Sequence, residues 1–259
     1  MKLEGKIEYI ENYELLLNDS EYANKVKVEI TEGAVYIAKK VIPAKKVEEY
    51  KNYLRNIGQS SLPNYQPIEL GTGNFHRMNR WDERAYVKGC FHQFVFYPWN
   101  QDVFNLFEMA KPVFQIKNVL SGNHPNRFMG PNGEDDCITR LAFQFYPKGL
   151  GGLNKHQDPV DHHQLTVPIM TMSKKGTEFK EGGAFVELSN GKKVFVDDVS
   201  EPGDVIFFNA RMTHGVDIID PKEKEDWISF EGRWMLLFAI NKVAGNNQIA
   251  NAVDLEAKK

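Results

Sequence analysis

Cysteine is scarce in this sequence, and the two that occur, Cys90 and Cys137, lie far apart. They form neither a closely spaced pair nor the repeated pattern that holds a structural zinc ion. A framework of several disulfides is therefore excluded, and the two cysteines can form one disulfide at most. Two free thiols in a reducing cytoplasm are the simpler interpretation.

Long apolar runs and an excess of basic charge are also lacking. The longest apolar run, WMLLFAI at 234–240, is far shorter than the roughly 20 residues that span a bilayer. The first residues, MKLEGKIEYIENYELL, mix acidic with apolar side chains and so differ from a signal peptide. With a net charge of −3 and a pI near 6.2, the chain has no surplus of lysine and arginine to neutralise phosphates. We therefore expect a soluble, cytoplasmic protein that binds neither membranes nor nucleic acid; the sequence does not indicate its oligomeric state.

Internal repeats, low-complexity tracts and proline-rich linkers are absent, so the sequence predicts a single domain. The length of 259 residues is compatible with one large core. Within it, residues 1–136 are interpreted as a mixed flank of helices and strands that includes a candidate lid. Residues 137–243 are interpreted as a β-rich core and residues 244–259 as a C-terminal tail.

The first half of the chain predicts a hairpin followed by two helices. VKVEIT at 26–31 alternates apolar and polar residues and precedes AVYIA at 34–38, as in paired strands. From Pro43 to Gly58, apolar residues recur every three or four positions, which predicts a helix that begins at the proline and ends at the glycine. A second helix is expected from about 101 to 120, bent near Pro112.

The second half predicts a series of short strands. CITRLAFQFYPKG, HHQLTVPIMTMS and GRWMLLFAINK are β-prone, and the last is apolar enough to be buried on both faces. Asn190-Gly191 lies between two alternating runs and is typical of a tight hairpin turn. Short strands separated by Gly, Pro and Asn favour a sandwich or jelly roll over an alternating βα fold.

Histidine is rare as well, yet three of the seven histidines lie in NKHQDPVDHH at 154–163. In a strand, His156 and Asp158 point to the same face and Gln157 points away. His214 follows at the end of the run DVIFFNARMTH, and a jelly roll can bring that strand end beside His156. Two histidines and one carboxylate on one side of a metal form the facial triad of non-haem Fe(II) oxygenases.

The order of these motifs resembles the Fe(II)/2-oxoglutarate dioxygenase superfamily, especially its phytanoyl-hydroxylase-like and prolyl-hydroxylase-like members. The resemblance rests on HQD at 156–158, PGDVIFF at 202–208, His214, and Arg233 at the start of the last strand. GAVYIAKKVIPAKKVEEYKNYL resembles the strand and helix that precede the core in those members. The resemblance covers residues 137–243 and implies a double-stranded β-helix (jelly-roll, cupin-like) core, mainly β with flanking helices.

The resemblance also implies roles for individual residues. His156, Asp158 and His214 would bind Fe(II), and Arg233 would pair with the distal carboxylate of 2-oxoglutarate. O2 would take the last position, and an unactivated C–H bond of a small-molecule substrate would be hydroxylated with release of succinate and CO2. A charged insertion, DPKEKEDWISFEG, lengthens the distance between His214 and Arg233, and Met235 replaces the usual Ser or Thr. Arg211 and Arg140 are therefore kept as alternative anchors.

The remaining pocket residues are assigned from their position along the chain. Gln144 and Tyr146 share one face of the strand before the metal motif and are expected to complete the cosubstrate site. Residues 74–101, rich in aromatic and basic side chains, form either a lid or part of the core. The predicted substrate contacts are listed together: Arg77, Arg80, Trp81, His163 and Arg140.

Two other functions remain compatible with the same motifs. A zinc-dependent hydrolase or lyase also uses two histidines, one aspartate and a water molecule, but it assigns no role to Arg233. A non-catalytic cupin-like binding module is the other alternative, although cupin metal motifs present two closely spaced histidines where this chain has His-Gln-Asp.

Overall fold

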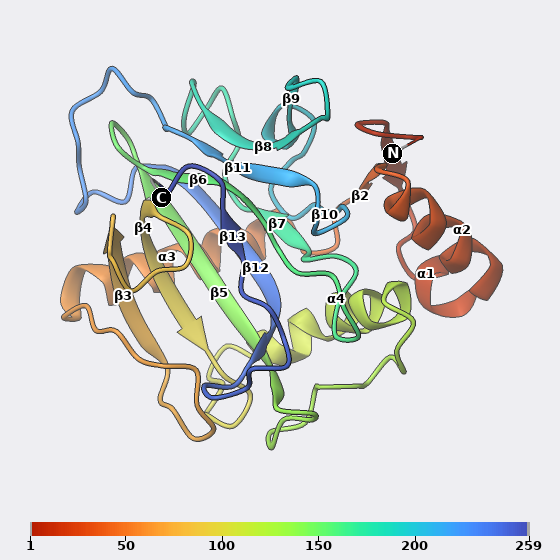
Figure 1. The fold of residues 1–259 in the computed structure, drawn as a ribbon. Coiled ribbons are helices and arrows are strands. Elements are labelled where there is room, and N and C mark those ends of the chain that lie inside the picture. The colour runs from red at the N-terminus through yellow and green to blue at the C-terminus, as the bar shows by residue number, and fades with distance from the viewer. Residues whose placement is uncertain (1, 258–259) are drawn as a thin grey trace.

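The computed structural model describes residues 2–257, and the strands in that range form one strongly curled sheet (Figure 1). The strands are β1 (Ile7–Ile10), β2 (Val35–Ala38), β3 (Phe75–Arg80), β4 (Gly89–Phe96), β5 (Cys137–Pro147), β6 (Gly152–Gln157), β7 (Ile169–Thr171), β8 (Gly183–Glu187), β9 (Lys193–Phe195), β10 (Val205–Phe207), β11 (Thr213–Asp217), β12 (Gly232–Lys242) and β13 (Val253–Asp254). Their order is β1-β2-β10-β7-β12-β5-β4-β6-β11-β8-β9, with β3 on β4 and β13 on β6.

Strand β4 turns the sheet over on itself. Its C-terminal part, His92–Phe96, pairs with β5, while Gly89 and Cys90 pair with Leu153 and Gly152 of β6. One wall therefore holds β10, β7, β12 and β5, and the facing wall holds β6, β11, β8 and β9. This is the jelly-roll core that the short strands and their turns predicted.

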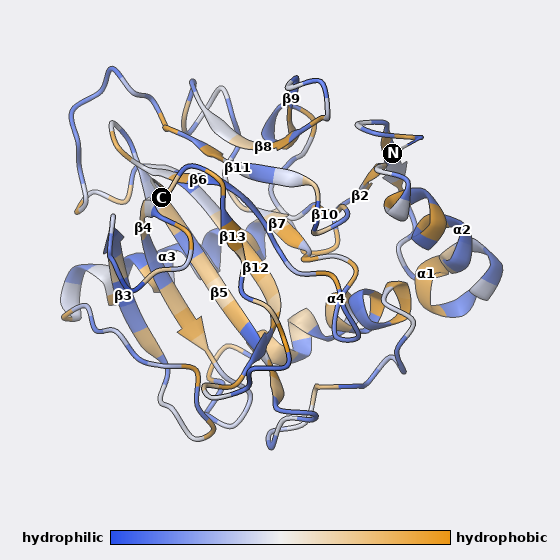
Figure 2. Ribbon diagram, in the orientation of Figure 1, coloured by the Kyte–Doolittle hydropathy of each residue, from blue (hydrophilic) through white to orange (hydrophobic). Residues whose placement is uncertain are grey.

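The long strands β5 and β12 separate the two sides of the sheet by alternation. Trp234, Leu236 and Phe238 pack in one apolar cluster with residues of α3 (Ala44–Ser60) and α4 (Leu106–Leu120). Each such side chain contributes about 1.5–3 kcal/mol when it is fully buried. The intervening residues, beginning with Arg233 and Met235, point to the inner side. Figure 2 shows the apolar residues concentrated on these central strands.

Several sequence predictions are confirmed. The helix expected from 43 to 58 is α3, and the Asn190-Gly191 turn joins β8 to β9. The apolar run GRWMLLFAINK forms β12, and residues on both of its faces are buried as predicted. The helix expected near 101–120 begins later than predicted, at Leu106, and contains Pro112.

Other predictions were wrong. Residues 26–31 are not a strand but belong to α2 (Ser20–Thr31), which follows the short α1 (Leu15–Asn18). Asp19 caps α2 by accepting from the backbone of Glu21 and Tyr22, and Val26 and Ile30 are buried at helical spacing. The alternation in VKVEIT therefore spans less than two helical turns, which is too short to distinguish the helical period of about 3.6 residues from the strand period of two.

Two boundaries also differ from the prediction. Gly58 does not end α3, which continues to Ser60; the glycine is required because a Cβ there would lie 2.2 Å from the ring of Phe230. His214 does not end the PGDVIFF strand but belongs to the next one, β11, because a turn at 208–212 intervenes.

The C-terminal residues are integrated into the fold. Strand β13 pairs with β6 next to Gln157 and His156, and Asp254 accepts hydrogen bonds from the backbone of Lys88 and from Asn154. No helix within residues 2–257 is long and apolar enough to cross a membrane.

A pair of buried histidines lies on the outer side of β3 and β4. His76 Nε2 and His92 Nδ1 are 2.9 Å apart, and His76 Nδ1 is 2.8 Å from the hydroxyl of Ser61. Burial lowers the pKa of His76 to about 4. Burial, and then the proximity of His76, lowers the pKa of His92 to about 3. Both rings are therefore neutral in the folded protein at neutral pH.

We expect these histidines to make the fold sensitive to acid. Between pH 6.5 and about 4 the unfolded chain binds protons at His76 and His92 that the folded chain does not, so the free energy of unfolding falls as the pH falls. His92→Leu should reduce that slope by up to about 1.4 kcal/mol per pH unit. Urea unfolding of wild type and variant at several pH values measures it, and equal slopes would contradict the assignment.

Candidate metal centre and adjoining cavity

The pairing of β6 with β11 brings the predicted metal ligands together. His156 and His214 are direct cross-strand neighbours, with ring centroids 4.1 Å apart. Asp158 follows β6, its backbone N–H bonded to the carbonyl of Ala210, and its Oδ2 lies 3.4 Å from His214 Nε2. One ligand atom from each of the three residues lies within 4.8 Å of the others.

Backbone carbonyls fix both imidazoles. His156 Nδ1 is 2.8 Å from the carbonyl oxygen of Asn154, and His214 Nδ1 is 2.8 Å from that of Met212. A carbonyl only accepts, so Nδ1 carries the proton in each ring and Nε2 is left as the ligand atom. Such partners orient the ligands of metal sites and make them more basic.

The protonation states also suit a cation. Burial, followed by the neighbouring His214, lowers the pKa of His156 to about 4, so the ring is neutral at pH 7. Burial alone would raise the pKa of Asp158, but the hydrogen bond and charge of His214, the charge of His156 and the charge of Lys117 outweigh it and hold that pKa below its ordinary value. Neutral imidazole and ionised carboxylate are the forms that bind metal.

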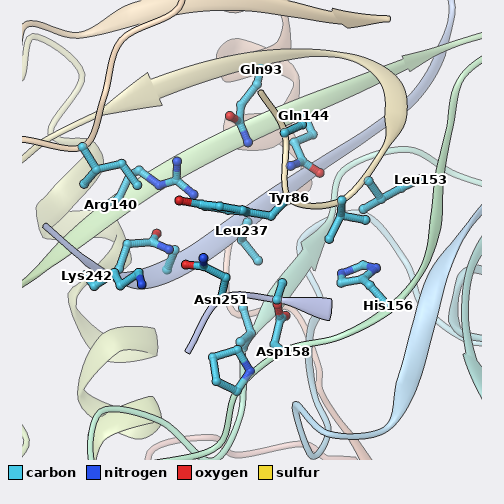
Figure 3. Close-up of a pocket in the computed structure, with 18 of the residues that line it drawn as sticks. Tyr86, Gln93, Arg140, Gln144, Leu153, His156, Asp158, Leu237, Lys242 and Asn251 are labelled. Atoms are coloured by element: carbon cyan, nitrogen blue, oxygen red, sulfur yellow. The ribbon is translucent and has the colours of Figure 1, made fainter. Parts of the chain in front are cut away.

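A cavity of about 490 Å³ opens beside the three ligands. This volume lies in the range of small-molecule sites. Figure 3 shows His156 and Asp158 at one end of it, Arg140 and Lys242 at the other, and the ring of Tyr86 between them. The ligands lie on one wall, so the rest of a metal's coordination sphere faces open space.

The opposite wall is the inner face of β4, β5 and β12. The strand register pairs Gln144 of β5 with Gln93 of β4 on one side and with Met235 of β12 on the other. It also pairs Tyr146 with Arg233. Gln93, Gln144, Tyr146 and Met235 line the cavity. The predicted cosubstrate residues Gln144 and Tyr146 are thus on the cavity wall, and the Tyr146 hydroxyl donates to Gln144 Oε1 at 2.5 Å.

Arg233 lies behind the residues that form this wall. Its Nε and Nη2 donate to the carboxylate of Asp197 at 2.7 and 3.0 Å, and both side chains are 1% exposed. Its guanidinium lies 5.6 Å from the ring centroid of Tyr146, and Nη1 is buried without a partner. The fork expected to bind 2-oxoglutarate is therefore engaged by Asp197, and one nitrogen remains.

The predicted substrate contacts separate into two groups. Arg77, Arg140 and His163 line the cavity. Arg80 points away from it and pairs with Glu225 at 3.2 Å, since it is three positions from Arg77 on the same strand. Trp81 lies in the turn after β3, has a φ of 56° and is 42% exposed. Neither Arg80 nor Trp81 belongs to the cavity lining of the described residues: strand alternation turns Arg80 outward, and Trp81 leaves the strand at its positive φ.

Two features escaped the sequence analysis. Lys117 of α4 is fully buried and donates to Gln164 Oε1 at 3.0 Å; burial lowers its pKa to about 7, although the charge of Asp158 raises it. A lysine between Val113 and Leu120, on the apolar face of the helix, is the sequence signal that could have indicated a buried charge at this position. Residues 244–247 and 249–252 also line the cavity, and no local pattern in the sequence indicates this role for the C-terminal segment.

Comparisons with known proteins agree with the fold. No family model matches the chain, and no curated protein sequence matches it. The structure is similar to a Pseudomonas putida prolyl-4-hydroxylase, with a TM-score of 0.53 and 13% identity over 85% of this chain and 98% of that one. It is also similar to a full-length Neurospora crassa protein in complex with alpha-KG, with a TM-score of 0.52 and 12% identity over 91% and 85% of the two chains.

A second structure of that Neurospora crassa protein, in complex with alpha-KG and thymine, gives a TM-score of 0.52 and 12% identity over 92% and 86% of the two chains. At such identities the similarity concerns the fold. The jelly-roll fold that the resemblance implied is confirmed.

Proposed function

We propose that this protein is an Fe(II)- and 2-oxoglutarate-dependent oxygenase that hydroxylates a small molecule. The observation that carries the proposal is the cluster of His156, Asp158 and His214 on the wall of a jelly-roll cavity. The fold alone supports many chemistries, but this donor set beside an open cavity matches the facial triad. Two free, buried cysteines suit a reducing compartment, so we also propose a cytoplasmic location.

The residues present fit the metal. The Nε2 atoms of His156 and His214 and one carboxylate oxygen of Asp158 would hold Fe(II), with both rings oriented by the carbonyls behind them. When bound, iron with 2-oxoglutarate and O2 supplies the oxidation of a C–H bond, giving succinate and CO2. The chain's part is to keep His156 neutral and Asp158 ionised, to orient both rings and to leave one side of the metal open.

The residues around Tyr146 fit the cosubstrate. Arg233 Nη1 is a buried cationic donor without a partner, a costly state that a carboxylate would relieve. We assign the distal carboxylate of 2-oxoglutarate to this nitrogen and to the polar pair formed by Tyr146 and Gln144. Arg233 thus keeps its predicted role with one nitrogen rather than with its fork.

A turnover assay tests the proposal. Protein purified without oxygen, then given Fe(II), 2-oxoglutarate and air, should form succinate slowly even without its own substrate. A chelator should abolish this turnover, and added Fe(II) should restore it while Zn(II) should not. Succinate is measured by chromatography. A zinc hydrolase or a binding module would leave 2-oxoglutarate unchanged, and that result would refute the proposed function.

A further inference from the structure

The end of the cavity away from the metal ligands is positively charged. Asp158 is the one carboxylate among the lining residues of the described chain, and it belongs to the ligand set. Four cationic side chains line the same cavity: Arg77, Arg84, Arg140 and Lys242. The charges of the lining are therefore unbalanced, and Figure 3 shows Arg140 pointing into the cavity opposite His156.

Two of these cations are already occupied. Arg84 forms an ion pair with Asp82 in which Nη2 and Oδ2 are 2.6 Å apart. Lys242 Nζ donates to the carbonyl oxygen of Ile249 at 2.7 Å. Arg84 therefore has a counter-ion, and Lys242 has a carbonyl acceptor and is partly exposed to water.

Arg77 and Arg140 lack such partners. The Nε atom of each is buried without a hydrogen-bond partner, and Arg140 as a whole is 9% exposed. Burial, and then the charge of Arg140, lowers the pKa of Arg77 to about 10. Two like charges, one buried and one partly buried, are costly without a paired counter-ion, so proteins keep them where a ligand supplies the opposite charge.

Neutral groups around the two arginines also lack partners. Gln93 Oε1 and the Tyr97 hydroxyl are buried and unpaired, and each residue is at most 2% exposed. Gln93 is the cross-strand neighbour of Arg77 and shares the inner face of β4 with Val95. Three unsatisfied polar side chains from three adjacent strands thus line one end of the cavity, Arg77, Gln93 and Arg140.

This end is distinct from the proposed cosubstrate site. Tyr146 and Arg140 lie on the same face of β5, six residues apart, which corresponds to about 20 Å along the strand. Arg233 is paired in register with Tyr146, and Arg140 is paired with Ala239. 2-Oxoglutarate is too short to contact both arginines at once.

We infer that Arg77 and Arg140 bind an oxyanion, a carboxylate or a phosphate, on the substrate that is oxidised at the metal. This inference rests on the proposed function and names the substrate class: a small molecule with an anionic head group at one end. Leu237 and Met235 line the cavity between the two ends, since they pair with Ala142 and Gln144 of β5, so the intervening part of the substrate is apolar. An arginine fork matches an oxyanion with two parallel hydrogen bonds.

The first test uses the protein without any ligand. Arg140→Gln and Arg77→Gln each remove a buried unpaired charge, so each should raise the melting temperature, by about 2–4 °C for a modest gain in stability. Arg80→Gln, on the outward face of the same strand as Arg77, is the matched control and should change it little, because its ion pair with Glu225 is exposed. If both cavity variants melt lower than wild type, the arginines are structural and the inference is wrong.

The second test measures binding to metal-free protein by ligand-observed NMR. The probes are benzoate, phenylacetate and hexanoate, each with its uncharged amide, and phenyl phosphate to distinguish phosphate from carboxylate. Wild type and Arg80→Gln should bind at least one acid about 10-fold more tightly than its amide, and Arg140→Gln should lose this preference. No preference in wild type, or a preference that survives Arg140→Gln, would overturn the inference.

The two proposals fail separately in these experiments. If the wild type prefers acids but never converts 2-oxoglutarate, the proposed function is wrong and the anion site stands. If Arg140→Gln raises the concentration of 2-oxoglutarate needed for succinate formation by about 10-fold or more, Arg140 anchors the cosubstrate and the inference is overturned while the oxygenase proposal stands.

Discussion

Replacing Asp158 with alanine is expected to abolish succinate formation while the protein stays folded. The change removes one of the three metal ligands and almost no core volume, because Asp158 packs at the cavity wall. Losing a residue that merely supports a ligand costs 10–100-fold in metal affinity or activity, so losing a ligand should cost about 100-fold or more. Turnover is followed as succinate at fixed Fe(II) and saturating 2-oxoglutarate.

The neighbour in the same tripeptide provides the control. Gln157 directs its side chain to the hydroxyl of Thr213 at 3.2 Å and is not a cavity-lining residue of the described chain. Gln157→Ala should retain turnover within a few-fold of wild type. Circular dichroism and thermal melting of both variants separate loss of metal from loss of fold. Turnover by a well-folded Asp158→Ala protein near the wild-type rate would remove Asp158 from the ligand set.

Part of the cluster of candidate metal ligands could be predicted because the information for His156 and Asp158 is local. His156 and Asp158 are two positions apart, and strand alternation alone places them on one side. His214 required the further expectation of a jelly roll, in which β6 and β11 are antiparallel neighbours. The strand predicted to carry His214 ends before this residue. His214 is still paired with His156, because that pairing depends on the order of the strands in the sheet and not on their exact boundaries.

The proposed anion site could be predicted only in part, because it depends on pairing between distant strands. Arg77 and Arg140 were both named as substrate contacts, and both line the cavity. Arg80, three positions from Arg77, received the same role and faces outward, since one odd step along a strand reverses the face. The sequence could not reveal the ion pair between Asp197 and the guanidinium of Arg233. The two residues are distant in the chain, and the curl of the sheet brings η1 (Val196–Asp198) beside β12.

Replacing Arg233 with methionine should destabilise the fold and also weaken the use of 2-oxoglutarate, and a second substitution separates the two effects. Alone, Arg233→Met leaves Asp197 buried without its partner, which typically costs about 3–5 kcal/mol in the free energy of unfolding. Adding Asp197→Asn removes the charge but keeps an acceptor for the backbone N–H of Ala184, which Asp197 binds at 2.6 Å. The double variant should recover most of the lost free energy of unfolding, as measured by urea unfolding.

The stable double variant then isolates the anchoring role. If Arg233 Nη1 holds the cosubstrate, the concentration of 2-oxoglutarate at half-maximal succinate formation should rise about 10-fold or more, the cost of one charged hydrogen bond. Asp197→Asn alone is the matched control: it perturbs the same buried pair but retains the guanidinium, so it should keep the wild-type requirement. If the double variant needs the same concentration of 2-oxoglutarate as wild type, Arg233 does not anchor the cosubstrate. Its role would then be limited to stabilising the fold through the ion pair with Asp197.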